Sequence, residues 1–273
     1  MPLPKSRTLA FAAMVVSIAG CDVSTEQEQA LGADVARQVE EQVPILADPL
    51  IARYVDSLGQ SIASRAEKTD IDWTFKVVNA GEVNAFALPG GYIYVNRGLL
   101  ARAGDMSELA GVLGHEIGHV TERHSVEQVQ RQQRTGIGVT ILCILTDVCS
   151  SDVARVAINV GGQLVFAKFS RAQEAEADSV GVRHVIQAGI DPTGIPRMFE
   201  RLMEERRRDP TVVDAWFGTH PLEQSRVQAT SDQIARIDPR ALRGLRRSDP
   251  GFSAVQAQLR ALPEPPKVAP PSP

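Results

Sequence analysis

Apolar residues recur along this chain at spacings that predict mainly helices, with one group of short strands. An i, i+4 stripe of leucine and valine predicts a helix over residues 25–43. Asp48-Pro49 is typical of a helix start, and the helix that it begins is expected to reach about residue 66. Three short strands are expected after it, at 71–77, 83–88 and 92–96. The predicted fold class is therefore α+β, mainly α-helical, with a small sheet.

The second half of the chain is also predicted to be helical. A broad apolar surface predicts a helix over 107–124, which Ser107 can cap. Ser170 with Gln173 resembles a capping box, and the helix that it opens is expected to end at Gly189. The remaining expectations are a short helix at 99–103, a helix from 191, a loop at 214–221 and a helix at 223–237. The apolar stretch within 136–169 is either a core helix or a glycine-hinged flap over an active site.

The first twenty residues resemble an export signal. Lys5 and Arg7 precede an apolar run at 9–18 that is too short to cross a bilayer. The small residues before Cys21 resemble the lipobox of bacterial lipoproteins, in which the chain is cut before the cysteine and the cysteine is acylated. The alternative is an ordinary secretory signal followed by a chance cysteine. We expect residues 1–20 to be a lipoprotein signal peptide, and Cys21 to carry a lipid that anchors a periplasmic protein to the inner or outer membrane.

Composition and charge narrow the remaining possibilities. With 43% hydrophobic and 23% charged residues, the chain is ordinarily globular, and we expect one domain at 21–240 and an arginine- and proline-rich tail at 241–273. The net charge of −4 gives nucleic-acid binding no electrostatic support. Cys143 and Cys149 can form a disulfide in an oxidising compartment, provided that the chain breaks between them. Two buried free thiols are the alternative.

The segment 107–124 contains the pattern H-E-x-x-H. On a helix, His115 and His119 stand one turn apart on one face, where two imidazoles can share a Zn²⁺ ion. Glu116 lies beside them, in position to take a proton from water at the metal. Three glycines in the same helix suggest a face where backbone must approach closely, and we expect the sheet or a substrate strand to lie there. An ordinary buried helix with two incidental histidines is the alternative.

A catalytic zinc site usually needs a third protein ligand. The metzincin completion fails, because it requires histidine six residues after His119; His124 falls one place short and is interpreted as a structural or surface residue. In the later segment 170–178, Glu174 and Asp178 share a helix face, whereas Glu176 points about 200° away from Glu174. The economical assignment places Glu174 on the metal, Asp178 against a ligand histidine and Glu176 in solvent. A charged exposed face is the alternative for these acids.

Four segments together resemble one family. H-E-x-x-H followed by S-R-x-x-E-x-x-A-D at 170–178 is similar to the zinc metallopeptidase family of HtpX and the CAAX prenyl protease, which includes the periplasmic BepA and LoiP branch. The segment NAFALPGG at 84–91, followed by YIYV, resembles the strand that precedes the active-site helix in that family. Thr219-His220-Pro221 with Arg226 resembles its T-H-P-x-x-x-x-R element. The similarity extends over residues 30–237 and lies nearest the exported branch.

The resemblance implies a gluzincin-like metallopeptidase domain with one Zn²⁺ per chain, bound by His115, His119 and Glu174. Glu116 would act as general base on water and then protonate the leaving amine. His220 would approach the metal or stabilise the oxyanion; in BepA-like members such a histidine can fill the open metal position and hold the enzyme inactive.

Further residues take expected roles from the same resemblance. Arg226 would neutralise charge near the site, and Arg171 would pair with an acid near the metal; structural salt bridges are the alternative for both. An extended substrate would add to an exposed strand edge, so that its backbone is recognised and its sequence is not. The residues expected at that edge are Asn84, Ala85, Phe86 and Ala87.

The expected function is that of a lipid-anchored zinc metalloendopeptidase that hydrolyses misfolded, misassembled or stalled envelope polypeptides in quality control. A zinc-stabilised periplasmic chaperone or assembly factor, with proteolysis gated by His220, is the competing hypothesis. A structural lipoprotein whose metal merely joins helices is a third.

Overall fold

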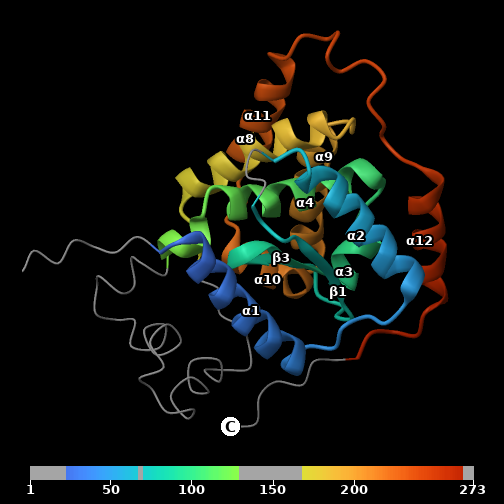
Figure 1. Ribbon diagram of the computed structural model, residues 1–273. Helices are drawn as coiled ribbons and strands as arrows, with labels where there is room; N and C mark the ends of the chain where they lie inside the picture. The colour runs from blue at the N-terminus through green and yellow to red at the C-terminus, as the bar shows by residue number, and fades with distance from the viewer. Residues whose placement is uncertain (1–22, 67–69, 129–167, 267–273) are drawn as a thin grey trace, which may run out of the picture.

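The computed structural model describes residues 23–66, 70–128 and 168–266, and Figure 1 labels its main elements. The expected signal peptide, Cys21, Cys143, Cys149 and the stretch 136–167 lie outside the described residues. In chain order the elements are α1 (Thr25–Gln42), α2 (Pro49–Ala63), β1 (Thr74–Val78), β2 (Ala85–Leu88), η1 (Pro89–Gly91), β3 (Tyr92–Asn96), α3 (Arg97–Arg102), α4 (Met106–Thr121), α8 (Arg171–Gln187), α9 (Gly194–Arg208), α10 (Pro210–Thr219), α11 (Gln224–Ala235) and α12 (Pro250–Ala261). The predicted fold class, mainly helical with a small sheet, is confirmed.

The three strands form one sheet in the order β1-β3-β2, with β1 parallel and β2 antiparallel to β3. Successive side chains of a strand point to opposite faces, so the sheet has two apolar sides. Ile93 and Val95 of β3 belong to the main core with α2 and α4, whereas Tyr94 belongs to a second cluster beneath α1. The Tyr94 hydroxyl donates to Glu40 of α1 at 2.8 Å. In Figure 1, α1 accordingly crosses one side of the sheet while α4 lies on the other.

Helix α4 is the centre of the molecule. All its residues from Met106 to Thr121 are buried, which is typical of a helix surrounded by other elements. It packs against α8 and α9 on one side and against α2 and the sheet on the other. A helix so enclosed is held rigidly, and it places the H-E-x-x-H residues inside the core.

The cap of α4 differs from the expected one. Asp105 is the N-cap, and its carboxylate accepts a hydrogen bond from the Glu108 amide at 3.1 Å. Ser107 lies inside the first turn and donates to the same carboxylate at 2.6 Å, as does Arg247 from far along the chain. Burial raises the pKa of Asp105, but these hydrogen bonds outweigh burial and leave that pKa below its usual value.

The sequence had suggested that the glycine face of α4 lies against the sheet or a substrate strand. In the structure this face lies against the neighbouring helices α8 and α9. A β-carbon at Gly114 would lie 3.2 Å from the Gly181 carbonyl oxygen of α8, and one at Gly118 would lie 2.9 Å from that of Ala177. A β-carbon at Gly111 would meet Ile195 of α9. The glycines therefore allow the backbones of α4 and α8 to approach until they touch.

The segment 214–221 is not a loop as predicted, because most of it belongs to α10. Pro210 lies in the first turn of α10, and Asp209 caps it by accepting a hydrogen bond from the Thr211 amide at 3.1 Å. The helix buries Trp216 completely and ends with His220 as its C-cap. Helix α9 likewise begins at Gly194 and not at 191.

The expected tail at 241–273 contains a folded helix. Three apolar residues of α12 at a helical spacing, Phe252, Val255 and Leu259, join the main core, and α12 packs on α2 and α3. Arg97 donates to backbone carbonyls at and beyond the end of α12, including Pro263 at 2.7 Å. The folded unit therefore continues past residue 240 to at least residue 263.

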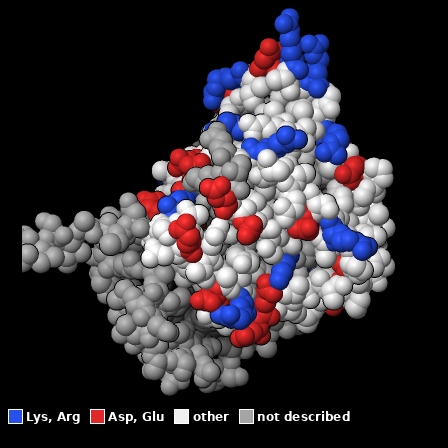
Figure 2. All heavy atoms as spheres, viewed as in Figure 1, with Lys and Arg blue, Asp and Glu red and all other residues white. Residues whose placement is uncertain are grey.

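Charged side chains are mixed on the face that Figure 2 displays. Acidic and basic side chains are interspersed among the described residues there, and a group of basic side chains gathers at the end of the molecule where α11 lies in Figure 1. Among the described residues, no helix combines the length and the apolar character needed to cross a bilayer.

Candidate metal centre

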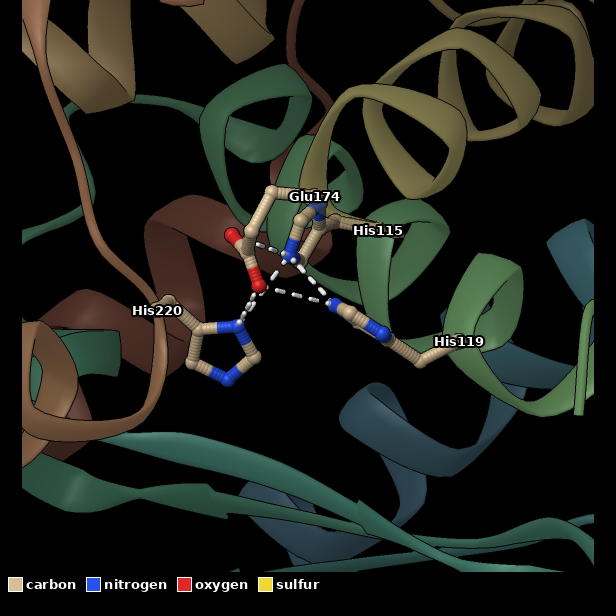
Figure 3. A group of neighbouring side chains, drawn as sticks. All are labelled: His115, His119, Glu174 and His220. Carbon is tan, nitrogen blue, oxygen red and sulfur yellow. Dashed lines mark hydrogen bonds and ion pairs between the residues drawn. The ribbon is translucent and has the colours of Figure 1, made fainter. Parts of the chain in front are cut away.

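Four buried side chains from three helices converge at one point. Helix α4 supplies His115 and His119, α8 supplies Glu174, and His220 follows the last turn of α10 (Figure 3). The Nε2 atoms of His115 and His119 are 3.1 Å apart, and His220 Nδ1 lies 3.3 Å from His115 Nε2. Glu174 Oε1 lies 3.1 Å from His220 Nδ1 and 3.4 Å from His119 Nε2.

These distances fit a metal ion. Donor atoms about 2.0–2.1 Å from a tetrahedral ion lie about 3.3 Å from one another, which matches the observed spacing. Imidazole nitrogen and carboxylate oxygen are donors that first-row divalent metals accept. The four side chains are at most 1% exposed, so a cation held there would be shielded from water on most sides. The residues therefore fit a bound metal ion with His115, His119, Glu174 and His220 as its candidate ligands.

The side chains behind these donors fix their orientation. Asp178 Oδ1 lies 2.8 Å from Nδ1 of His115, which leaves Nε2 of that ring directed at the cluster. Arg226 donates to both oxygens of Asp178, at 2.8 and 2.7 Å, to the Pro221 carbonyl at 2.9 Å, and forms an ion pair with Glu174. Arg226 therefore holds two carboxylates, those of Asp178 and Glu174, in place.

Charge in the cluster is balanced by neighbours. Burial raises the pKa of Glu174, but the charge of His220 outweighs burial and lowers that pKa overall. Burial likewise raises the pKa of Asp178, and Arg226 outweighs it there. Both carboxyls therefore stay ionised. Burial lowers the pKa of His115, but Asp178 and Glu174 reverse the effect and raise it. Burial keeps the pKa of His119 well below its ordinary value. Neighbouring charges therefore outweigh burial at Glu174, Asp178 and His115, but not at His119.

Glu116 is buried without a hydrogen-bond partner among the described residues. Both carboxylate oxygens lack one, and the Nε2 atom of His220 lies 3.6 Å from Oε1. Burial raises the pKa of Glu116. A carboxylate that makes no hydrogen bond with these residues and lies beside a cluster of metal donors is poised to exchange a proton with a molecule bound there, because a raised pKa suits a general base.

The sequence matches the description "Peptidase family M48" over residues 49–234. The chain belongs to peptidase family M48. It is 31% identical to the beta-barrel assembly-enhancing protease of Yersinia pestis over 228 residues, which cover 81% of this chain and 46% of that protein. It is also 33% identical to the mitochondrial metalloendopeptidase OMA1 of Danio rerio over 201 residues, which cover 71% of this chain and 41% of that protein. The chain spans about half the length of these relatives. Its family and its metalloendopeptidase relatives show that it is a metalloprotease.

In this M48 chain, two aromatic residues that the sequence interpretation missed line the donor cluster. The ring of Phe169 stacks on His119 with centroids 3.9 Å apart, and Trp216 stacks on His220 at 4.6 Å. Trp216 lies four residues before His220, so recognition of α10 as a helix would have placed both on one face. Phe169 immediately precedes the capping box at Ser170, and that position alone gave no signal of its role.

His124, which the sequence had suggested to be a structural or surface residue, is buried and contacts the candidate ligand His119. Its Nδ1 atom lies 2.9 Å from Nδ1 of His119. Its Nε2 atom lies 3.3 Å from Glu176, whose side chain is exposed as expected.

Arg171 does not lie near the M48 metal donors, which corrects the expectation. Its side chain is 83% exposed and forms an ion pair with Glu223 at 2.7 Å. It is the first residue of α8, and its side chain is directed to solvent at the opening of that helix. Such an exposed pair contributes little to stability.

The position of residues 84–87 suits a substrate-binding edge, but the burial of their side chains limits how a substrate could bind there. Strand β2 lies at one edge of the sheet and contacts α4, so it is next to the metal-site helix. Ala85, Phe86 and Ala87 are buried, while Asn84 is half-buried, and its Oδ1 has no hydrogen-bond partner in the part of the chain that the structure describes. The side chains at 85–87 therefore pack within the protein, and a substrate strand would have to bind through backbone atoms.

Proposed function

We propose that this M48 chain is a zinc-dependent endopeptidase, lipid-anchored at Cys21 in the bacterial envelope, that cleaves misfolded or stalled envelope proteins. The observation that carries the proposal is the convergence of His115, His119 and Glu174 beside the Glu116 carboxylate, which has no hydrogen-bond partner among the described residues. The names of the bacterial relatives, beta-barrel assembly-enhancing proteases, support an envelope substrate.

Each residue would perform one part of the hydrolysis. His115, His119 and Glu174 would hold zinc, which when bound supplies Lewis acidity to polarise a peptide carbonyl and acidify water. Glu116 would accept the proton of the attacking water on its carboxylate and deliver it to the leaving amine. Asp178 would hold His115 in the required tautomer.

The backbone of β2 would bind the substrate. An extended peptide added along residues 84–87 would be held by main-chain hydrogen bonds, which do not distinguish sequences. Broad cleavage of unfolded chains follows from that mode of binding.

The test is cleavage of casein and of misassembled outer-membrane protein by the chain from Asp22 onward, with its metal content measured. Glu116→Gln should keep its zinc and lose activity by about 10²–10⁴-fold, since it cannot accept a proton. His119→Ala should lose zinc. Undiminished cleavage by the glutamine variant, or an unchanged zinc content in the alanine variant, would refute the proposal.

The lipid anchor needs its own measurement. Mass spectrometry of the N-terminal peptide should find an acylated Cys21, and Cys21→Ser should release the protein from the membrane fraction. An unmodified cysteine at the mature N-terminus would remove the anchor from the proposal and leave the peptidase intact.

A gated form of the same site is the second candidate. His220 Nδ1 lies within the donor cluster, so a metal bound by all four donors would have no open position for a substrate or water. A protein in that state would act as a zinc-stabilised chaperone or assembly factor. His220→Ala should then increase proteolysis many-fold. Unchanged cleavage would leave His220 as an ordinary neighbour of the substrate.

A further inference from the structure

The two metal-site histidines of α4 are held in different ways. The Nδ1 atom of His115 faces the carboxylate of Asp178, whereas that of His119 faces the imidazole of His124 at 2.9 Å. His124 is only 2% exposed, and its other nitrogen lies 3.3 Å from the carboxylate of Glu176. His119 is thus joined to a surface acid through a second histidine.

The proton positions along this path agree with one another. Nε2 of His119 points into the donor cluster. When that nitrogen binds a metal, the ring carries its proton on Nδ1 and can donate it to Nδ1 of His124. His124 then carries its own proton on Nε2 and donates it to Glu176. With a metal on Nε2 of His119, each ring has one donor nitrogen and one acceptor nitrogen in use.

The backbone has to depart from the helix to create this contact. In a continuous helix, residues 119 and 124 would point about 140° apart and their rings would not meet. Helix α4 instead ends at Thr121, and Arg123 adopts φ 58°, a left-handed conformation that residues other than glycine rarely take. The Arg123 side chain bonds to Glu28 at 2.8 Å and to the Val23 carbonyl at 2.6 Å, both at the start of the described chain. These bonds hold the turn that directs His124 back toward the metal site.

One face of the His119 ring is also fixed by packing. Phe169 stacks on it with centroids 3.9 Å apart and an interplanar angle of 27°. With one face covered and Nδ1 bonded, the ring has little freedom to rotate. His124 lies within hydrogen-bonding distance of Nδ1, so it favours the tautomer that carries the proton there.

We propose that His124 is a positioning residue, which sets the tautomer and orientation of His119 through the path His119–His124–Glu176 and thereby tightens metal binding. The inference rests on the assignment of His119 as a metal ligand in the proposed function. It assigns a role to a residue whose spacing in the sequence places it outside the H-E-x-x-H pattern.

The test measures metal binding directly, with the full chain, Zn²⁺ and a competing chelator. His124→Phe keeps an aromatic ring but removes the acceptor, and should weaken zinc binding about 10–100-fold. His124→Asn places an amide oxygen near the former Nδ1 and should recover most of that loss. With Co²⁺ in place of zinc, the visible absorption of His124→Phe should shift, while the unfolding temperature of the metal-free protein stays near that of wild type.

Matched variants distinguish the effect of the His119–His124–Glu176 path from a general effect of negative charge near the site. Glu176→Gln should weaken zinc binding a few-fold, whereas Glu122→Gln, which removes an acid from an exposed site on the same turn, should have no effect. Wild-type affinity and spectrum in His124→Phe, or equal losses in His124→Phe and His124→Asn, would overturn the inference. If His119→Ala also bound zinc normally, the ligand assignment itself would be wrong; if His119→Ala lost zinc while His124→Phe kept it, only the positioning role would fail.

Discussion

The contact between α4 and α8 leads to a sharp prediction for Gly118→Ala. A β-carbon at this position would lie 2.9 Å from the carbonyl oxygen of Ala177 and 3.1 Å from its Cα. Both are backbone atoms, so no side chain can rotate away to make room. The two helices must separate, and with them His119 on α4 and Glu174 on α8.

The size of the effect follows from the geometry. Restoring an ordinary contact requires a shift of about 0.5 Å, and overpacking of this kind costs about 1–3 kcal/mol. Alanine in a helix interior returns about 1 kcal/mol relative to glycine, so the net loss of stability should be below about 2 kcal/mol. Metal–ligand distances tolerate only about 0.2 Å, so the same shift should weaken zinc binding and lower kcat/KM by about tenfold or more.

The assay combines urea unfolding of the metal-free protein with zinc titration against a chelator and cleavage of casein. The matched control is Gly218→Ala in α10, where a β-carbon meets nothing within 4 Å, so stability should rise slightly and zinc binding should not change. Wild-type zinc affinity in Gly118→Ala would refute the argument that helix approach sets the ligand geometry. A large loss of stability with intact zinc binding would refute it as well.

Three further changes test other parts of the structure. Asp178→Asn should weaken zinc binding about 10–100-fold and lower the free energy of unfolding by about 1–3 kcal/mol, because it removes one of the two ionised partners of the buried Arg226 and leaves Glu174 as the other; chelator competition and urea unfolding measure the two effects. Asp105→Asn should lower the free energy of unfolding of the chelated protein by about 1 kcal/mol at pH 7. Because the folded pKa of Asp105 is depressed, this difference should persist above about pH 4 and disappear as the pH falls below it, and a constant difference down to pH 2 would contradict the argument. Arg171→Ala should leave cleavage and the unfolding midpoint near wild type, since its partner Glu223 is also exposed, and a marked loss of activity would restore a role at the site.

Local patterns predicted the parts of the site that depend on neighbours in sequence. H-E-x-x-H on a helix and the capping box at Ser170 both require only a few adjacent residues, and the structure has both in place. The strand at 92–96 has the predicted limits for the same reason. Glu174 was separable from Glu176 because a helix directs residues two apart to different sides.

Contacts between distant segments could not be predicted from local sequence patterns. Asp105 and Ser107 were both plausible caps of α4, and Arg247, 142 residues further along the chain, bonds to Asp105 in the folded protein. The glycines of α4 indicated that another segment approaches the helix closely. The periodicity of the sequence does not identify that segment. Residues 214–221 contain a glycine and a proline typical of loops, yet burial of Trp216 favours the helix. His124 was hidden because its contact depends on a left-handed residue that no local pattern predicts.

The donors of the metal centre come from widely separated parts of the chain, with 105 residues between His115 and His220 in numbering. A cation that binds these donors acts as a crosslink, closing long loops that the unfolded chain would otherwise explore freely. Metal binding is then also folding energy, so the metal-free protein should be the form that other proteases degrade. The abundance of this chain in a cell would consequently follow the supply of its metal, even when its gene is expressed at a constant rate.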